Sequence, residues 1–483
     1  MFSAPDGGLL KLLGPEDIKK IDETSMKILE EIGMMVKSEE ARKIFAENGA
    51  IVDNETAVVK IPRSLVKQAI QSAPSKVVLY AQNPDNDLHL EKARTHYGTG
   101  GTVLYALDRD TGEKRTTTTK DVRDIARMVD YCNNVAFYVV NTYPQDVPDS
   151  ASDINRFYWA ITNTTKHVQG GMYTMKGLKD VIAMAEEIAG GAEKLRQRPI
   201  ISFIVLMISP LMMDGEYTDY LIEIAKKGIP VTVASEPLAG ATSPVTIAAT
   251  LAMNNAEVLA GITLTQLVNP GASILYGSTS SIMDMREGTY MAGSVEGGMI
   301  SACLAQMTQY YGLPMYGTAG MTDAKINDSQ AGYESALSAM TVGLAGCNFI
   351  HDSVGIMEMC QVFSYEKMAT DNEILGNVLR VMKGVEVNED TLAYDLIKTV
   401  GPGGHFLDQE HTGKYVRKEF FFPKIADRQT RIRWEEAGSL TAEDRARKLV
   451  DKILDKHIPK PVDSKVKAAI RAKFPEIKGD ELY

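Results

Sequence analysis

The sequence has little cysteine and no long apolar run. Its four cysteines are widely spaced over 483 residues and form no C-x-x-C pair, which excludes a disulfide framework and a zinc knuckle. No run approaches the roughly 18 apolar residues that a membrane-spanning helix needs. The first residues, Met1 to Gly14, lack the basic start and apolar core of a signal peptide. We therefore expect a reduced, cytoplasmic protein that contacts no membrane.

Positive charge is also scarce. Lysine and arginine number 52 against 63 acidic residues, for a net charge of -11. This balance argues against nucleic acid or an anionic membrane surface as a partner. A chain of this length with 44% hydrophobic residues can bury a large core, so the composition is that of a large enzyme.

Short apolar runs alternate with helical patterns through the middle of the chain. This alternation predicts βα units and a parallel sheet, and eight units in about 260 residues predict a closed (β/α)8 TIM barrel of the α/β class. The eight predicted strands are Thr102–Leu107, Val135–Asn141, His167–Tyr173, Ile200–Ile208, Pro230–Ala234, Ser273–Gly277, Pro314–Gly317 and Phe349–Asp352.

Three parts are expected along the chain. Residues 1–95 should form a mostly helical cap, with a first helix that begins at Pro15 and ends at Gly33. Residues 96–383 should form the barrel. Residues 384–483 should form a mixed C-terminal extension that packs on the barrel, with an amphipathic helix from Ala442 to Lys456 and a charged, peripheral tail beyond Pro459.

Titratable groups are few where the predicted strands end, the place at which a barrel of this kind carries its chemistry. They are Glu236, Asp323, Lys325 and the pair His351-Asp352. No other histidine stands at ligand spacing from His351, and we expect no metal. Glycine-rich stretches such as Gly98–Gly101 match no phosphate-binding loop, and no nucleophile elbow is present. An acid–base lyase or isomerase that uses these few groups is an alternative.

Aromatic residues are frequent at the same strand ends. Rings around a pocket suit a quaternary ammonium ion, which has no N–H to donate and is held by cation–π contact. For any single tyrosine, ordinary barrel packing is the simpler reading. These rings are Tyr97, Tyr105, Tyr138, Tyr143, Tyr173, Tyr276, Tyr316, Phe363 and Tyr365.

Several motifs together resemble the trimethylamine methyltransferases, over nearly the whole chain from Pro15 to about His457. The motifs are Gly98–Asp108, Ala260–Gly271, Thr322–Glu334, Gly346–Asp352, Gly404–Leu407, His411-Thr412 and Asp427-Arg428. This resemblance implies a barrel that moves a methyl group from an amine to cob(I)alamin on a partner corrinoid protein. The founding members use pyrrolysine, whereas Gly317 to Asp323 holds only standard residues here. The chain thus looks like the non-pyrrolysine branch, which demethylates quaternary amines such as glycine betaine.

The resemblance also implies how the site would work. A quaternary ammonium leaves as a neutral amine, so no catalytic acid, base or metal is needed, and the protein acts by positioning the substrate. We expect a cognate corrinoid protein at the C-terminal mouth of the barrel, and a homo-oligomer. The residues expected to bind the substrate are Tyr97, Gly100, Tyr143, Gln169, Glu236, Tyr316, Thr318, His351 and Phe363.

One departure from the family pattern bears on the substrate. Family members often carry an arginine after the Pro-Val of the seventh strand, and its place is taken here by Tyr316 in Pro314-Met-Tyr316. A substrate carboxylate would then be held by His351 or by backbone amides, or the substrate differs. Proline betaine, carnitine, γ-butyrobetaine, a neutral quaternary amine and a non-catalytic amine-binding role all stay open.

Overall fold

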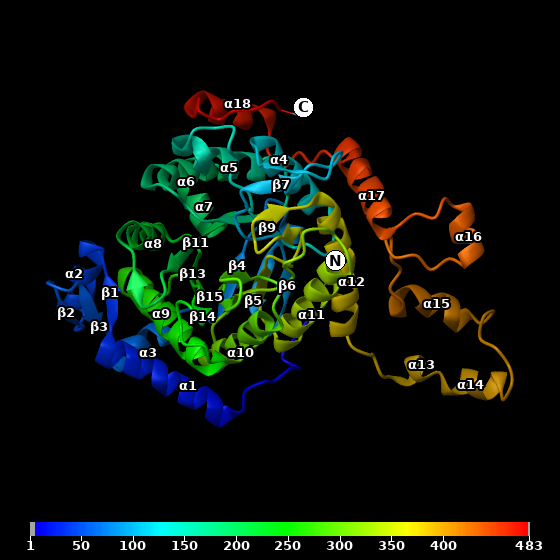
Figure 1. Cartoon of the computed structure of the whole chain (residues 1–483), viewed down its shortest axis with the longest axis horizontal. Coiled ribbons are helices and arrows are strands. Elements are labelled where there is room, and N and C mark those ends of the chain that lie inside the picture. The colour runs from blue at the N-terminus through cyan, green and yellow to red at the C-terminus, as the bar shows by residue number, and fades with distance from the viewer. Residues whose placement is uncertain (1–4, 482–483) are drawn as a thin grey trace.

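Eight parallel strands form the centre of the molecule. The computed structural model describes residues 5–481, and each strand pairs with the next one along the barrel (Figure 1). A parallel bridge between Gly98 and Phe137 joins the first strand to the second and closes the sheet. The predicted (β/α)8 barrel is confirmed. Its strands are β6 (His96–Tyr97), β9 (Phe137–Val139), β10 (His167–Gly170), β11 (Ile201–Met207), β13 (Val231–Ser235), β15 (Ile274–Ser278), β18 (Met315–Thr318) and β19 (Phe349–His351).

The first barrel strand is not the one that the sequence suggested. The predicted strand Thr102–Leu107 contains β7 (Tyr105–Leu107), which belongs to a separate sheet of β20 (Ile356–Met357), β21 (Val362–Phe363), β7 and β8 (Lys114–Thr116). The two-residue β6 takes the barrel position and pairs with β19. The prediction was wrong because β6 is too short to make an apolar run.

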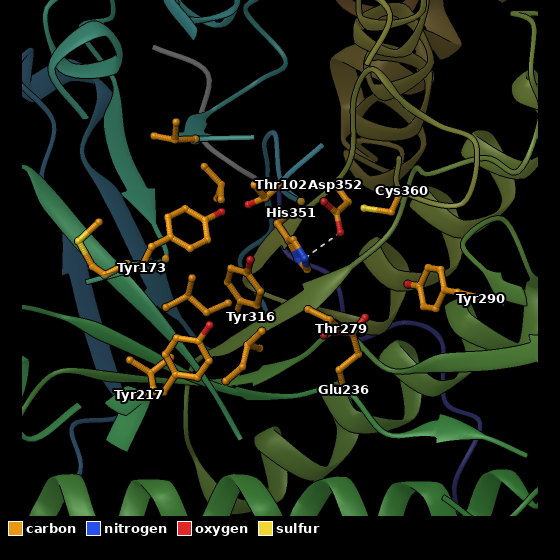
Figure 2. Close-up of a pocket in the computed structure, with 18 of the residues that line it drawn as sticks. Thr102, Tyr173, Tyr217, Glu236, Thr279, Tyr290, Tyr316, His351, Asp352 and Cys360 are labelled. Carbon is orange, nitrogen blue, oxygen red and sulfur yellow. Dashed lines mark ion pairs between the residues drawn. The ribbon is translucent and has the colours of Figure 1, made fainter. Parts of the chain in front are cut away.

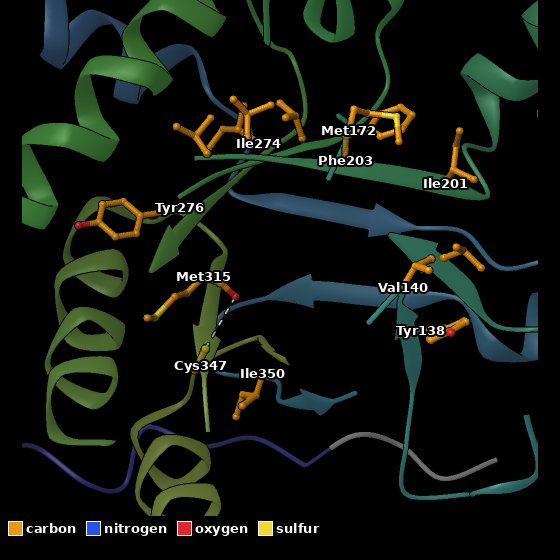
Figure 3. Packing of buried hydrophobic residues seen from close by; sticks show 14 of the residues in the cluster. Tyr138, Val140, Met172, Ile201, Phe203, Ile274, Tyr276, Met315, Cys347 and Ile350 are labelled. Carbon is orange, nitrogen blue, oxygen red and sulfur yellow. Dashed lines mark hydrogen bonds between the residues drawn. The ribbon is translucent and has the colours of Figure 1, made fainter. Parts of the chain in front are cut away.

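One helix covers the barrel after each strand. Side chains alternate along a strand, so Tyr138, Phe203 and Tyr276 point outward into a core shared with these helices (Figure 3). The helices are α4 (Thr119–Tyr131), α5 (Ser152–Ile161), α6 (Met175–Ala189), α8 (Gly215–Lys227), α9 (Ile247–Val268), α10 (Val295–Tyr311), α11 (Ser329–Ala345) and α12 (Tyr365–Met382), with a short α7 (Ala192–Gln197) after α6.

Helix α9 is long and apolar enough to cross a membrane. However, 83% of its apolar window is buried inside the molecule, as in the core helix of a globular protein. Glu257 of this helix is also buried and accepts hydrogen bonds from the Ser209 hydroxyl and the Leu211 amide. Packing against the barrel therefore explains why this helix is so apolar.

A hairpin closes the N-terminal end of the barrel. Its strands β4 (Lys76–Leu79) and β5 (Leu88–Glu91) place Leu79 and Leu90 in a second, inner core with Phe137 and Phe349. The chain after β4 meets the start of β10, where the Tyr80 carbonyl oxygen lies 2.7 Å from His167 Nδ1. With this end filled, the interior of the barrel opens toward the carboxyl ends of its strands.

The rest of the N-terminal part packs beside α9. Its helices are α1 (Pro15–Lys27), continued by a π-turn to Ile32, α2 (Glu39–Glu47) and α3 (Arg63–Ser72). The expected cap was mostly helical, but it also contains a small sheet of β2 (Ile51–Asp53), β3 (Val58–Lys60) and β1 (Met34–Val36), extended by β12 (Met212–Met213).

The C-terminal part divides into a projecting segment and two docked helices. Figure 1 shows α13 (Glu389–Leu392), α14 (Tyr394–Val400), α15 (Glu410–Glu419) and α16 (Arg431–Glu436) lying away from the barrel. Helix α17 (Ala442–Lys456) has the predicted bounds and packs on α4 and α12. The tail beyond Pro459 is docked rather than peripheral, because Ile470 of α18 (Ser464–Lys473) and Phe474 are buried.

Candidate active site

A cavity of about 480 Å³ opens at the carboxyl ends of the barrel strands. Its floor includes Val139, Ile204 and Tyr316, which are interior positions of β9, β11 and β18. Residues Met359 to Gln361, from the turn between β20 and β21, cover one side. The polar groups of its wall decide what the cavity can bind (Figure 2).

His351 and Asp352 form a buried pair at the end of β19. His351 Nδ1 lies 2.8 Å from the Gly317 carbonyl oxygen, and Nε2 lies 2.8 Å from Asp352 Oδ2. A carbonyl oxygen only accepts, so Nδ1 carries a hydrogen. The carboxyl group of Asp352 is the nearest polar neighbour of Nε2, ahead of the Thr318 hydroxyl at 3.0 Å.

The backbone of Asp352 is held in an unusual conformation. Its φ of 62° lies in the left-handed region, which a residue with a side chain seldom adopts. Gly100 packs against it so closely that a Cβ there would lie 2.5 Å from His351 Cδ2. The loop after β6 therefore needs glycine at this point, and it fixes the direction of the Asp352 side chain. One oxygen of that side chain, Oδ1, is buried with no hydrogen-bond partner in the described structure.

Glu236, just after β13, is a second acidic residue of the cavity wall. Its side chain faces the open space of the cavity, although it lies deep in the molecule. Burial, with the nearby Asp352 carboxyl group as a smaller cause, raises the pKa of Glu236 to about 7, against a weaker opposing effect of His351. The net charge of the cavity therefore changes with the protonation of Glu236.

Five tyrosines complete the wall: Tyr173, Tyr217, Tyr220, Tyr290 and Tyr316. The Tyr316 ring stacks on the His351 ring with centroids 4.2 Å apart. Figure 2 shows Tyr173 and Tyr217 on one side of Tyr316, and Tyr290 on the opposite side beyond Glu236. The described lining contains no lysine or arginine. Aromatic faces and the acidic residues Glu236 and Asp352, without a lysine or arginine beside them in the described lining, suit a positively charged ligand.

The structure brings together some of the residues predicted to bind substrate. Glu236, Tyr316 and His351 line the cavity. Thr318 lies behind them, with its hydroxyl 3.0 Å from His351 Nε2. Gln169 is deeper in the barrel and donates to Ser202 and Thr232, while its Oε1 has no partner among the described residues.

Three other predicted residues lie away from the cavity. Tyr97 points outward, because its position on β6 faces the helices, and its hydroxyl donates to the Ala339 carbonyl oxygen at 2.8 Å. Tyr143 lies at the rim, where its hydroxyl donates to Asp149 and its ring meets Tyr173 edge-on. Phe363 packs against Tyr365 in the small sheet that includes β7.

Sequence reasoning did not select Tyr217, Tyr220, Tyr290 or Cys360. Tyr217 and Tyr220 lie in the first two turns of α8, and Tyr290 lies in the β16 (Ser281–Asp284) to β17 (Thr289–Met291) hairpin. The start of a barrel helix lies near the mouth, so an aromatic pair there was a usable signal. Nothing in the sequence places the hairpin over the cavity.

The other titratable candidates have structural partners. Asp323 accepts from the amides of Ala292 and Gly293, and Lys325 donates to the Asp323 carbonyl oxygen. Among residues 5–481, no three histidine, cysteine or acidic side chains gather as metal ligands. An acid–base reaction that uses Asp323 or Lys325 has no geometric support, since neither lines the cavity.

A buried ion pair stabilises the wall from behind. Lys367 Nζ of α12 lies 2.6 Å from Asp371 Oδ2, and it also donates to the Ser335 hydroxyl and the Gly320 carbonyl oxygen. Asp371 in turn accepts from the Gly355 amide at 2.7 Å. These contacts connect the loops after β18 and β19, the two strands that carry Tyr316 and His351.

Comparisons with known proteins agree with the barrel fold and show the family of this chain. The family model of trimethylamine methyltransferase (MTTB) matches residues 6–480. The chain is 39% identical to trimethylamine methyltransferase MttB of Desulfitobacterium hafniense, over 95% of this chain and 92% of that protein. It is 35% identical to glycine betaine methyltransferase of the same species, over 95% and 96%. Monomethylamine methyltransferase MtmB of Methanosarcina barkeri shares the fold, with a TM-score of 0.51, 14% identity and coverage of 93% and 96%.

Proposed function

This chain belongs to the trimethylamine methyltransferase family and is a methyltransferase, and from that premise we propose that it demethylates a quaternary amine. The methyl acceptor in this proposal is cob(I)alamin carried by a cognate corrinoid protein. The observation that carries the proposal is the cavity wall of five tyrosines and Glu236, without a lysine or arginine in the described lining. The absence of pyrrolysine from Gly317 to Asp323 supports a quaternary rather than a tertiary amine.

In this proposal, the reaction needs no acid or base among the side chains. A methyl carbon leaves a quaternary nitrogen, the electron pair of the C–N bond stays on that nitrogen, and the product is a neutral tertiary amine. No proton has to move, so the protein's part is to hold the cation, direct one methyl group toward the mouth and exclude water. The corrinoid supplies the nucleophile that accepts the methyl group. Tyrosine rings and ionised Glu236 perform the binding.

The charge of the wall bears on which quaternary amine fits. Glycine betaine carries a carboxylate close to its nitrogen, and this group would meet Glu236 without a cationic partner. Arg156, which stacks over the Tyr173 ring, is already engaged by the carbonyl oxygens of Val140, Thr142 and Gly171. We therefore place quaternary amines without a carboxylate ahead of glycine betaine as substrates. Carnitine and γ-butyrobetaine, with a more distant carboxylate, come between them.

Methyl transfer to free cob(I)alamin tests the proposal directly. The conversion to methylcobalamin is followed by absorbance with choline, tetramethylammonium, carnitine, γ-butyrobetaine, proline betaine, glycine betaine and trimethylamine. We expect turnover of at least one quaternary amine and none of trimethylamine. Turnover of trimethylamine as fast as the best quaternary amine would overturn the proposal, and binding without any transfer would identify an amine-binding protein instead.

Two further parts of the proposal concern the corrinoid partner and the cellular location of the enzyme. The corrinoid protein should approach the mouth, since the β4–β5 hairpin fills the opposite end of the barrel. The reduced cobalt that this chemistry needs agrees with a cytoplasmic location. A pull-down with the corrinoid protein encoded beside this gene, if there is one, tests the partner.

A further inference from the structure

The wall of the cavity is divided into a charged half and an uncharged half. Its ionisable side chains other than tyrosine and cysteine, Glu236, His351 and Asp352, come from the ends of β13 and β19. The described lining residues from β9, β10, β11 and α8 carry no charge. Figure 2 shows Tyr173 and Tyr217 on the side of the cavity away from Glu236. We define the uncharged wall by the side chains of Val139, Tyr173, Ile204, Leu206 and Tyr217.

Strand β11 supplies the apolar centre of the uncharged wall. Ile204 and Leu206 are two residues apart, so both side chains point to the interior of the barrel. They stay partly exposed, whereas the other residues of β11 are buried. Both residues line the cavity, so their exposed surface faces its open space. Apolar atoms of a ligand that cover this surface would remove it from water and gain affinity.

The cavity has more room than a small cation fills. Its volume of about 480 Å³ lies in the range of about 300–1,000 Å³ typical of pockets that bury drug-sized ligands. A trimethylammonium group beside Glu236 would leave the space along the uncharged wall unfilled. Gly171 widens this space, because a Cβ there would meet nothing nearer than Ile204 Cγ2 at 3.7 Å, an ordinary contact distance.

The charges of the wall determine what kind of group fits the remaining space. No lysine or arginine occurs in the lining that the structure describes, so a carboxylate there would lose its water without gaining a cationic partner. A second positive charge would lie on the side away from Glu236. An uncharged, apolar chain is therefore the group that the uncharged wall stabilises.

We propose that the uncharged wall binds an apolar tail on the substrate, so that the favoured ligand is a trimethylammonium compound with an uncharged tail of several carbons. This inference rests on the proposed function, because it places the quaternary nitrogen beside Glu236. A tail held along β11 also fixes the orientation of the nitrogen and its methyl groups, which is the positioning that methyl transfer needs.

Calorimetry without a corrinoid measures the tail contact separately from methyl transfer. The ligands are tetramethylammonium and its homologues with one ethyl, propyl, butyl or hexyl group. Burial of one methylene raises affinity about threefold to fourfold, so butyltrimethylammonium should bind at least tenfold more tightly than tetramethylammonium. γ-Butyrobetaine, whose chain of similar length ends in a carboxylate, should lose this gain. An affinity that does not rise with the length of the tail would overturn the proposal.

A larger side chain on β11 tests where the tail lies. Leu206 belongs to neither hydrophobic core, so in Leu206→Trp the indole ring can occupy the space of the tail. The affinity for butyltrimethylammonium, relative to tetramethylammonium, should fall at least tenfold. Gly171→Val fills the same space from the end of β10 and replaces this variant if Leu206→Trp fails to fold.

The matched control carries the same change outside the cavity. Leu337 on α11 is 58% exposed and does not line the cavity, so Leu337→Trp should keep the wild-type ratio of affinities. Far-ultraviolet circular dichroism checks that each variant is folded. A ratio that stays unchanged in both Leu206→Trp and Gly171→Val would overturn the proposal.

Methyl transfer to free cob(I)alamin separates this inference from the proposed function. If tetramethylammonium is demethylated but no homologue binds more tightly, the tail site is wrong and the proposed function stands. If the homologues bind tightly but no ligand is demethylated, the proposed function is wrong and the tail site stands. If Leu206→Trp binds tetramethylammonium but no longer demethylates it, the space belongs to the methyl acceptor and the proposal is overturned.

Discussion

At the scale of single residues, Glu236 decides the charge of the cavity. Burial raises the pKa of its carboxyl group to about 7, so a change of pH near neutrality alters the charge of the wall at this position. The cavity therefore becomes a better site for a cation once Glu236 has lost its proton.

This gives a pH dependence with a definite sign. Glu236 has its pKa raised to about 7 by burial, so it is neutral below that pH and negative above it. The affinity for a quaternary amine should rise as the pH increases through about 7, and binding should release a proton. Calorimetry at pH 6 and pH 8.5 measures both effects. Glu236→Gln should bind more weakly at high pH and lose the pH dependence, and an unchanged profile in that variant would assign the titration elsewhere.

The tyrosines should contribute through their rings rather than their hydroxyl groups. Tyr290→Ala should weaken the binding of a quaternary amine by about 1–2 kcal/mol, between the values for an exposed and a fully desolvated cation–π contact, whereas Tyr290→Phe should bind nearly as well as the wild type. Tyr143→Ala is the control, since Tyr143 lies at the rim outside the lining. Equal losses for Tyr143 and Tyr290 in calorimetry would contradict this assignment.

The sequence could indicate that this site is aromatic, but not which rings form it. Tyr316 and His351 were predictable because they stand at the ends of strands that are long enough to recognise. Tyr97 was misplaced because its side chain direction depends on a two-residue strand, whose register no sequence pattern reveals. Tyr290 was missed because it reaches the cavity from a hairpin inserted between β15 and α10, and its position depends on tertiary packing.

At the scale of elements, α12 connects the stability of the fold to the shape of the site. Lys367→Met should lower the free energy of unfolding by about 3–5 kcal/mol, because Asp371 would stay buried without its cation. The double variant Lys367→Met with Asp371→Leu should recover most of this loss. Chemical denaturation of the full chain measures the effect.

The matched control for that change is a second ion pair with the same spacing. Lys176 and Asp180 on α6 are also four residues apart, but the Lys176 side chain is 65% exposed. Lys176→Met should change stability by less than about 1 kcal/mol. If both lysine variants lose the same free energy of unfolding, the buried Lys367–Asp371 pair is not what connects the loops after β18 and β19.

The elements of this fold differ in how predictable they were. Seven of the eight barrel strands coincide with predicted runs, because strands buried on both faces are continuously apolar. Helix α17 was predictable to the residue, since Thr441 and Asp444 form a capping box at its start. The projecting segment from α13 to α16 was not predictable as a separate element, because its short helices have compositions that also suit packing against a barrel.

At the scale of the whole molecule, the net charge of -11 should assist the capture of a cation. Electrostatic attraction over long distances is screened by salt, with a Debye length of about 30 Å at 0.01 M and about 8 Å at 0.15 M. The value of kcat/KM for a quaternary amine without a carboxylate should therefore fall several-fold as salt is raised across this range. It is measured with free cob(I)alamin in excess.

Two comparisons separate this long-range effect from the contacts in the cavity. Glycine betaine has no net charge, so its kcat/KM should respond much less to salt than that of choline if both are turned over. Glu236→Gln changes the total charge very little, so this variant should keep most of the salt dependence even though its affinity is lower. If the salt response disappeared with Glu236→Gln, the attraction would come from that one carboxylate. A salt response equal for the cation and the zwitterion would instead show that the charge of the molecule plays no part in capturing the substrate.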